Sequence, residues 1–367
     1  MNVLVWCSWV ARPVGGMEIT ALELAIELQR RGHQVVLAGA YDNAPELRAR
    51  IPAGMPYYAF DVHRRRVKPH LKAARLLWRA MGEHRTEVVS AHGSVIAVHE
   101  VCRIRNVPLV WTLHGAGPSP KDPVGRLKTM AIRRILMSPN THIIGVSRAT
   151  TEIVRQEFPR LDEARLHVIG VGRRDENALT ALVLPKAAPP WHLGFVGRLA
   201  ERKRPLDLVA VANGLNNTLD YKFEVFGDGP LLEALRTAIS AARLEHRFTL
   251  HGYWDRGSPS MVEQFQIMVH TDCVEPFGAA LLEAQLGGRP VVAYRVGGNP
   301  DIIEHGTTGW LVPLGDVKGL AEGVRRITEK GFTEFAAASR QRATKLFPMA
   351  RMVSEYETLF EQLCASH

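Results

Sequence analysis

The stretch from Cys273 to Pro300 decides the fold, and it reads C-V-E-P-F-G-A-A-L-L-E-A-Q-L-G-G-R-P-V-V-A-Y-R-V-G-G-N-P. Its pattern predicts a helix from Ala279 to Leu286, ended by the glycines and proline of 287–290, and then a buried strand from Val291 to Tyr294. Gly278 therefore precedes a helix. Unpaired backbone N–H groups and the positive end of the helix dipole make such a junction a good phosphate site.

Two carboxylates flank this junction. Glu275 lies in the loop before it, and Glu283 lies in the helix eight residues after Glu275. Eight residues are about two turns at 3.6 residues per turn, so both belong to roughly the same face. A ligand with an anionic middle and hydroxyl groups at both ends suits this arrangement, and a nucleotide sugar has that pattern. A single Glu on a helix is usually only a solvated side chain, but here an ordered series of motifs surrounds the pair.

These motifs carry a family resemblance. They are E-P-F-G-x-x-x-x-E-A at 275–284, G-x-P-V-V-A at 288–293, V-G-G-x-P-D-I-I at 296–303 and G-x-x-G-W-L-V-P at 306–313. Together they resemble the retaining GT-B glycosyltransferases of the large family 4. The resemblance implies an α/β fold of two Rossmann-like domains, whose parallel sheets face an interdomain cleft. It also implies a nucleoside diphosphate sugar as co-substrate and no cofactor.

The resemblance assigns roles within the first motif. Glu275 is expected to contact the transferred sugar and Glu283 to hold the ribose hydroxyls. Phe277, Gly278 and Ala279 are expected to contact the donor as well.

A second motif, Gly197 to Lys203, resembles the family's G-R-L-x-x-x-K signature. Arg198 offers a planar fork and Lys203 a point charge, and both suit a diphosphate. Without the resemblance they would be read as a charged loop. Tyr253 and Trp254 follow a strand predicted at 247–251, where the family cups the nucleobase, although they are also interpretable as surface aromatics.

The N-terminal half opens with a strand, a glycine turn at Gly15 and Gly16, a helix predicted from Ile19 to Arg30 and a second strand, which is the start of a Rossmann-like domain. The G-x-G-x-x-G fingerprint of dinucleotide-binding proteins is absent. The resemblance places Gly15 and Gly16 against the donor diphosphate, and the alternative is a plain tight turn. His114 follows a predicted strand at 109–113, where the family has a His that contacts the transferred sugar. His92 is a weaker candidate of the same kind.

The length of 367 residues suits two domains. We expect an acceptor-binding domain at 1–175, a proline-rich linker at 176–190, a donor-binding domain at 191–348, and a C-terminal helix at 349–367 that returns to the first domain. The four cysteines are scattered, which argues against a disulfide framework or a zinc site and favours a reducing cytoplasm. They are Cys7, Cys102, Cys273 and Cys364.

Net charge is unevenly placed. Residues 1–175 hold 26 Lys and Arg against 15 Asp and Glu, a net +11, whereas the remainder has a net −2. An anionic partner of the first half is therefore expected: nucleic acid, an anionic substrate or a phospholipid surface. Two basic amphipathic stretches, 64–79 and 126–137, fit helices on an anionic bilayer. Ordinary surface helices remain the alternative. No stretch is long and apolar enough to span a bilayer, and the N-terminus lacks the features of a signal peptide.

The prediction is thus a metal-independent hexosyltransferase, cytoplasmic and peripheral on the membrane, that acts on a lipid-linked or lipopolysaccharide-type acceptor. No D-x-D-like pair lies in a suitable loop, and Asp272 is too close to the paired glutamates to replace one. A soluble transferase with a small acceptor is the nearest alternative. Other classes are a non-enzymatic protein that binds nucleic acid or an anionic surface, a phosphorylase-like enzyme and a non-hydrolysing epimerase. No nucleic-acid recognition motif is visible.

Two segments depart from the family pattern. The usual N-G-V-D before the linker is replaced by Gly170-Val171-Gly172-Arg173-Arg174, and the commoner Pro-Ser before Glu275 by His270-Thr271-Asp272-Cys273. The first departure concerns the contacts between the domains, and the second concerns the loop before the sugar site.

Overall fold

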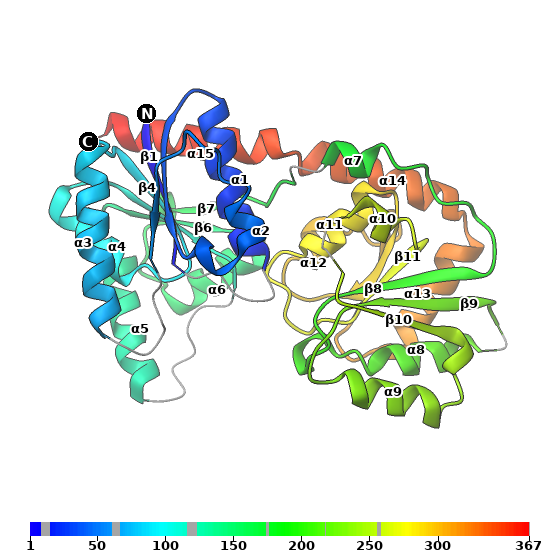
Figure 1. Cartoon of the computed structure of the whole chain (residues 1–367). Coiled ribbons are helices and arrows are strands. Elements are labelled where there is room, and N and C mark those ends of the chain that lie inside the picture. The colour runs from blue at the N-terminus through cyan, green and yellow to red at the C-terminus, as the bar shows by residue number, and fades with distance from the viewer. Residues whose placement is uncertain are drawn as a thin grey trace. The chain divides into compact units, whose positions relative to one another are not determined.

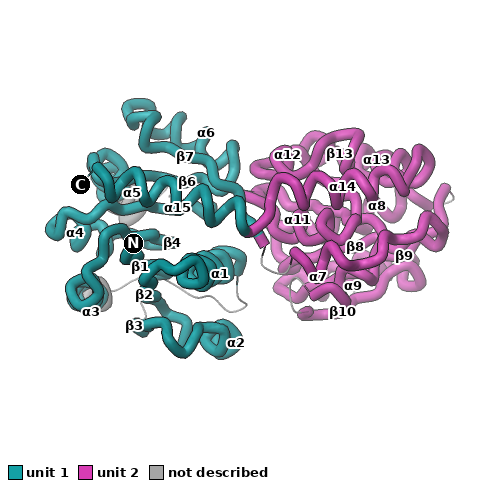
Figure 2. The backbone as a smooth tube through the Cα atoms, turned by 90° about the horizontal axis from the view of Figure 1, so that it is seen from above, with its two compact units in different colours: residues 1–172, 350–367 teal, residues 173–349 magenta. Residues whose placement is uncertain are grey.

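The computed structural model describes residues 1–8, 15–60, 67–115, 123–173, 176–216, 218–254 and 258–366, with side chains omitted at 67–70 and 123–129. These residues form two compact units (Figures 1 and 2). Unit 1 comprises Met1–Gly172 and Ala350–His367, and unit 2 comprises Arg173–Met349. Each unit is a parallel β-sheet with helices on both faces, so the predicted α/β class with two Rossmann-like domains is confirmed.

The sheet of unit 1 has seven strands in the order β3-β2-β1-β4-β5-β6-β7, and every neighbouring pair is parallel. Nearly all of its central positions are buried, which is typical of a sheet covered by helices on both faces. The strands are β1 (Asn2–Cys7), β2 (Gln34–Gly39), β3 (Tyr57–Ala59), β4 (Val88–His92), β5 (Leu109–Leu113), β6 (Thr141–Gly145) and β7 (Leu166–Val168).

Alternation along β1 divides the helices between the two faces. Leu4 and Trp6 pack with buried side chains of α3, α4 and α5, which therefore share one face of the sheet. The return helix α15 belongs to unit 1, where the hydroxyls of Tyr356 and Thr112 lie 2.8 Å apart. The helices are α1 (Gly16–Arg30), α2 (Pro45–Arg48), α3 (Val67–Glu83), α4 (Ile96–Arg105), α5 (Pro123–Leu136), α6 (Arg148–Glu157) and α15 (Met349–Ala365), with short 3₁₀ turns η1 (Tyr41–Asn43) and η2 (Glu163–Arg165).

The sheet of unit 2 has six parallel strands in the order β10-β9-β8-β11-β12-β13. They are β8 (Trp191–Val196), β9 (Tyr221–Phe226), β10 (Phe248–Gly252), β11 (Ile267–His270), β12 (Val291–Tyr294) and β13 (Gly309–Val312). The helical elements are α7 (Glu176–Thr180), η3 (Glu201–Lys203), α8 (Asp207–Leu215), α9 (Leu232–Ala241), η4 (Glu245–Arg247), α10 (Pro259–Val262), α11 (Ala279–Leu286), α12 (Asn299–Ile302), α13 (Val317–Glu329) and α14 (Phe332–Leu346).

The segment at 176–190 is more ordered than a proline-rich connection suggests. It opens with α7, whose Leu179 is fully buried, and the carbonyls of Leu182 and Lys186 accept hydrogen bonds from Arg340 and Gln266. The segment therefore lies within unit 2. The chain passes from one unit to the other at 172–173 and again at 349–350.

Candidate functional site

In unit 2, glycines allow the loops that follow β8 and β9 to pack closely against each other. A Cβ at Gly227 would lie 1.9 Å from the Gly197 carbonyl oxygen, and a Cβ at Gly229 would lie 2.5 Å from that of Leu199, so both positions require glycine. The Leu199 N–H also donates to the Asp228 carbonyl at 2.9 Å. This packing holds the loop that carries Arg198, whose side chain is exposed. Ligands of open parallel sheets bind at such strand ends.

Lys203 lies at the centre of a buried charge network. Its Nζ donates to Glu275 Oε2 at 2.9 Å and forms an ion pair with Asp272 Oδ2 at 2.6 Å. Asp272 is fully buried, and Lys203 is only 7% exposed. Burial alone would raise the pKa of Glu275, but the Lys203 ammonium and the His270 ring outweigh it and hold that pKa well below its usual range. Glu275 is therefore a stable carboxylate.

Backbone contacts join the two loops that carry this network. The Thr271 hydroxyl donates to the Lys203 carbonyl at 2.7 Å, and the Cys273 N–H donates to the Arg202 carbonyl at 2.9 Å. From the other side, the Gly298 N–H donates to the Glu275 carbonyl at 2.8 Å. A Cβ at Gly297 would lie 1.9 Å from that same carbonyl oxygen. The glycine pair of V-G-G-N-P thus allows close packing against Glu275.

Helix α11 begins as the sequence predicts. Gly278 is its N-cap in the left-handed region, with φ of 104°, a conformation that glycine adopts without steric cost. Ala279 is the first helical residue, and the buried Phe277 packs edge-on against Phe347 with ring centroids 5.7 Å apart. The N-terminus of α11 is therefore fixed in place, and its first N–H groups follow Glu275 by about four residues in the chain.

Glu283 lies on α11 and is almost completely buried. Its Oε1 is 2.9 Å from an Nη of Arg173, and both side chains are under 5% exposed. Arg173 belongs to one of the segments that depart from the family pattern, and its neighbour Arg174 lies outside the described residues. Sequence reasoning missed this pair, because 110 positions separate the two residues and no local pattern links them.

The two aromatic candidates differ in their surroundings. Trp254 packs edge-on against Phe226 and His251, whereas Tyr253 is 64% exposed. Both follow β10 at the carboxyl edge of the sheet. Their contact with a nucleobase stays a prediction.

In unit 1, the structure brings His92 and His114 together. His92 is the last residue of β4, and His114 directly follows the neighbouring strand β5. His92 Nδ1 lies 2.9 Å from His114 Nε2, so one ring donates and the other accepts. Burial lowers the pKa of His114 to about 4, and burial together with His114 lowers the pKa of His92 well below its ordinary value. Both rings are therefore neutral near pH 7.

The Gly15–Gly16 turn forms the start of α1. Gly15 is the N-cap and Gly16 the first helical residue, three positions earlier than the start at Ile19 that the glycine turn suggested. Among the described residues, a Cβ at Gly16 would meet no atom within 4 Å. The diphosphate contact of this turn stays a prediction.

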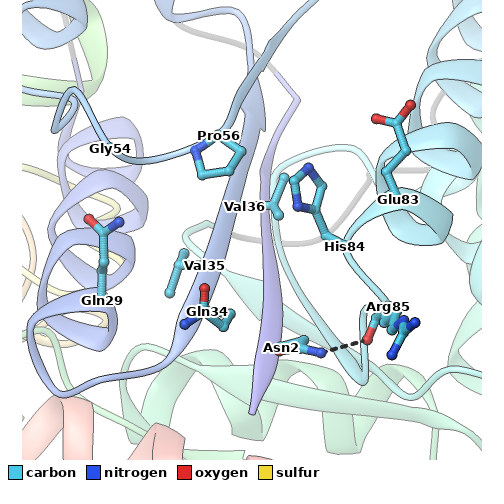
Figure 3. Close-up of a pocket in the computed structure, with 10 residues that line it drawn as sticks. All are labelled: Asn2, Gln29, Gln34, Val35, Val36, Gly54, Pro56, Glu83, His84 and Arg85. Atoms are coloured by element: carbon cyan, nitrogen blue, oxygen red, sulfur yellow. Dashed lines mark hydrogen bonds between the residues drawn. The ribbon is translucent and has the colours of Figure 1, made fainter.

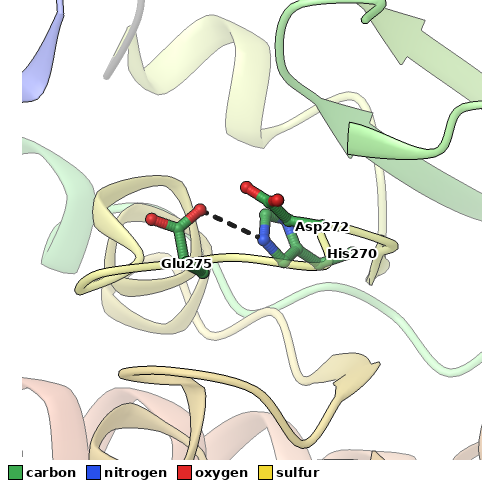
Figure 4. Close-up of side chains that lie close together, drawn as sticks. All are labelled: His270, Asp272 and Glu275. Carbon is green, nitrogen blue, oxygen red and sulfur yellow. Dashed lines mark ion pairs between the residues drawn. The ribbon is translucent and has the colours of Figure 1, made fainter. Parts of the chain in front are cut away.

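His270, Asp272 and Glu275 also have the spacing of metal ligands (Figure 4). One ligand atom from each lies within 4.8 Å of the others. The Lys203 ammonium, however, already lies within 3 Å of both carboxylates. A divalent ion here would have to displace a buried lysine, so this lysine supplies the positive charge of the cluster. Metal independence itself stays a prediction.

A small cavity of about 230 Å³ lies elsewhere, in unit 1 (Figure 3). Asn2 and Gln34, at the N-terminal ends of β1 and β2, line it together with His84 and Arg85. His92 and His114 are at the opposite, carboxyl edge of the same sheet. Within unit 1, the cavity is therefore separate from His92 and His114.

Comparisons with known proteins agree with these observations. Residues 14–176 match the family model "Glycosyltransferase Family 4", and residues 183–346 match "Glycosyl transferases group 1". The chain is 28% identical over 352 residues to 2-deoxystreptamine N-acetyl-D-glucosaminyltransferase of Streptomyces fradiae, covering 85% of this chain and 83% of that protein. It is 24% identical over 307 residues, 79% of each chain, to UDP-Gal:alpha-D-GlcNAc-diphosphoundecaprenol alpha-1,3-galactosyltransferase of Escherichia coli.

The fold has solved counterparts as well. The crystal structure of Anabaena Alr3699/HepE in complex with UDP superposes with a TM-score of 0.81 and 20% identity, over 99% of this chain and all of the other. At 20% sequence identity, this structural similarity is evidence for the fold. Two parallel-sheet units, and a family model matched to each half, therefore lead to one conclusion: the chain is a glycosyltransferase with the GT-B fold.

Proposed function

We propose that this enzyme transfers a hexose from a nucleoside diphosphate sugar to an acceptor hydroxyl and retains the anomeric configuration. The observation that carries the proposal is the Lys203–Glu275 network, which lies directly before the N-terminus of α11. It places a fixed carboxylate beside a buried ammonium and a helix start that attracts anions. A sugar diphosphate needs these groups at its hexose and at its phosphates.

The leaving diphosphate is stabilised by charge rather than by proton transfer. An ammonium carries three N–H donors, and two carboxylate oxygens lie within 3 Å of Lys203 Nζ, so a phosphate oxygen can serve as the third partner. The exposed Arg198 adds a forked cation, and the first N–H groups of α11 add a partial positive charge. Such preorganised donors stabilise the negative charge that develops on a leaving group.

His114 supplies a neutral hydrogen-bonding group for the transferred sugar. Its lowered pKa keeps the ring uncharged at neutral pH, and its contact with His92 fixes the ring at the end of β5. Glu283 serves the ribose hydroxyls. These roles of His114 and Glu283 are the ones that the family resemblance implies.

We further propose a lipid-linked or lipopolysaccharide-type acceptor on the cytoplasmic face of the membrane. The supporting feature is the α3–α5 surface, the outer face of α3, α4 and α5 up to Met137. Five of the eleven exposed large apolar side chains of the described residues lie on it. They are Leu71, Trp78, Ile104, Met130 and Met137.

Cations surround these apolar side chains. Residues 71–85, 96–105 and 130–137 hold eight Lys and Arg against two Asp and Glu. The guanidinium of Arg105 lies over the Trp78 ring at 4.0 Å, which ties α4 to α3. Apolar side chains among cations suit a bilayer with anionic headgroups. Arg64, Arg65 and Arg66 of the first basic stretch lie outside the described residues.

A small soluble acceptor is the second candidate, because the Streptomyces fradiae relative is named for its action on 2-deoxystreptamine. Among the described residues no helix combines the length and apolar character that crossing a bilayer requires, so either acceptor accords with that finding.

The test is a panel of UDP-, GDP- and ADP-sugars with lipid-linked and small acceptors. Mass spectrometry detects transfer, and proton NMR of the product reports the anomeric configuration. Transfer with inversion would overturn the retaining mechanism. Failure of every nucleoside diphosphate to raise the melting temperature would overturn the donor class, since a ligand at 100 times its Kd stabilises by about 2.7 kcal/mol.

A further inference from the structure

The buried ion pair between Arg173 and Glu283 has a role that the family motifs do not assign. Both residues belong to unit 2, and the guanidinium reaches Glu283 Oε1 at 2.9 Å. The backbone of Arg173 is itself fixed, because it forms a parallel β-bridge with Pro348. The cation is thus held in one place relative to α11.

The other oxygen of the same carboxylate is unsatisfied. Glu283 Oε2 is buried and has no hydrogen-bond partner among the described residues. A buried acceptor without a partner costs free energy, and a native structure that keeps one needs a reason for it. A ligand hydroxyl would remove that cost. Because Oε2 is closed to solvent in this structure, the hydroxyl must displace the side chains that cover it.

A carboxylate at such a depth needs a compensating charge. Without a cation, a buried carboxylate is strongly destabilising and either takes up a proton or turns toward water. Arg is suited to this task, because it stays charged and its planar fork fixes the orientation of the partner carboxylate.

We propose that Arg173 is a positioning residue for donor binding. It pairs with the Glu283 carboxylate and orients it through Oε1, and thereby reserves Oε2 as the acceptor for a hydroxyl of the donor's ribose. This inference rests on the proposed function, and it concerns a residue outside the motif of the paired glutamates.

The test compares ligands with and without ribose. Arg173→Met removes the charge, Arg173→Lys keeps the charge without the fork, and Glu283→Gln removes the acceptor charge. Isothermal titration with UDP, GDP, ADP and inorganic diphosphate gives the affinities. The matched control is Arg289→Met, which removes another buried arginine of unit 2 that bonds to the Phe265 and Gly287 carbonyls and not to Glu283.

We expect Arg173→Met to weaken nucleotide binding at least tenfold and to raise KM for the donor by a similar factor. Turnover at saturating donor and the affinity for inorganic diphosphate should change less than about twofold. Arg173→Lys should fall between wild type and Arg173→Met. The double variant Arg173→Met/Glu283→Gln should bind no more weakly than Glu283→Gln alone, because both changes remove one interaction. Arg289→Met should bind nucleotide as wild type does.

The other outcomes distinguish a wrong donor from a wrong role for Arg173. If wild type binds none of the three nucleotides, the proposed donor is wrong. If wild type binds but Arg173→Met binds equally well, the positioning role is wrong while the donor stands. Equal losses for nucleotide and inorganic diphosphate would mean a general structural role and would also overturn the inference. Should Arg173→Met fail to fold, Arg173→Lys decides, because wild-type affinity in that variant would contradict the need for the fork.

Discussion

Lys203 is a single residue on which two functions depend. It compensates the charges of the buried Asp272 and the partly buried Glu275, and it is the proposed partner of the leaving diphosphate. Asp272 occupies a position that departs from the family pattern, so this enzyme has one more carboxylate beside the lysine than the motif requires. The extra carboxylate draws the ammonium toward the protein and weakens its attraction for phosphate.

We expect Lys203→Ala and Arg198→Ala each to lower turnover about a hundredfold or more, the scale seen when one charge-stabilising donor is removed. The two variants should differ in stability. Lys203→Ala removes the ammonium between the buried Asp272 and the partly buried Glu275 and leaves Asp272 with the half-exposed Arg202 guanidinium at 3.5 Å. This loss should cost about 3 kcal/mol, whereas Arg198 is exposed and its loss should be nearly neutral. Steady-state kinetics and thermal melts give both quantities. Lys222→Ala, an exposed cation of β9, is the control, and wild-type turnover in Arg198→Ala and Lys203→Ala would refute the diphosphate role.

His114 predicts a pH dependence of stability. Its folded-state pKa is lowered to about 4 by burial, whereas an unfolded His titrates near 6.5. Between these values the unfolded chain binds more protons, so stability falls as pH drops from about 6.5 toward 4 and is full above that window. His114→Asn removes this contribution. The difference in melting temperature between pH 7 and pH 5 should therefore be smaller in His114→Asn than in wild type, and an equal or larger difference would contradict the shift.

At the scale of elements, glycines decide how closely the loops approach Glu275. Gly297 has φ of 48°, and its Cβ would meet the Glu275 carbonyl. Gly306 has φ of 81° but open space around its Cβ position. Both positions therefore share the conformational cost of a side chain in the left-handed region, about 1–2 kcal/mol, but only Gly297 also has the clash.

We consequently expect Gly297→Ala to lower turnover at least tenfold. The added methyl group would push against the Glu275 carbonyl and so displace the loop that carries the Glu275 carboxylate. Gly306→Ala should lose stability with turnover close to wild type. Circular-dichroism melts and donor kinetics on the two variants separate the effects. Equal kinetic losses would show that the backbone strain alone, rather than the contact with Glu275, matters.

The elements themselves were largely predictable, because their ends are encoded locally. α11 and β12 have the predicted limits, since Gly278 and the glycines and proline of 287–290 terminate the pattern on both sides. β5 also has its predicted limits. α1 begins earlier than expected, because Gly16 was read as part of a turn although it can also serve as a first helical residue.

The partners of the charged residues were not predictable. Lys203 meets Asp272, and Glu283 meets Arg173, across 69 and 110 positions respectively. Hydrophobic periodicity and turn chemistry report only on neighbours in sequence, so they carry no information about such pairs. The departures from the family pattern were the available signal, since both Asp272 and Arg173 lie in segments where the usual residues are replaced. His92 and His114 were each identified from strand ends, but their mutual contact required the order of the strands.

At the scale of the whole molecule, charge and exposed apolar surface coincide on unit 1. Residues 1–175 have a net charge of +11 and the rest −2, and α3, α4 and α5 carry both cations and exposed apolar side chains. A small soluble acceptor would not require this combination. A lipid-linked acceptor would, because the enzyme must remain at the bilayer to reach it.

We therefore expect wild type to sediment with anionic vesicles at low salt and to be released at high salt, because screening shortens the range of the attraction. Each Lys or Arg near an anionic surface contributes about 1 kcal/mol, so Lys72→Glu/Arg75→Glu should abolish most of the binding, and Trp78→Ala should weaken it at every salt concentration.

The charge-matched control, Lys222→Glu/Lys330→Glu, changes exposed cations of unit 2 and should sediment as wild type does. All variants should still bind nucleotide, because the α3–α5 surface lies in unit 1 whereas Lys203, Glu275 and Glu283 lie in unit 2. Wild type that stays in solution with anionic vesicles would exclude the membrane surface and favour the small acceptor. Loss of binding in the control as well would show that net charge alone, rather than the α3–α5 surface, attracts the protein to lipid.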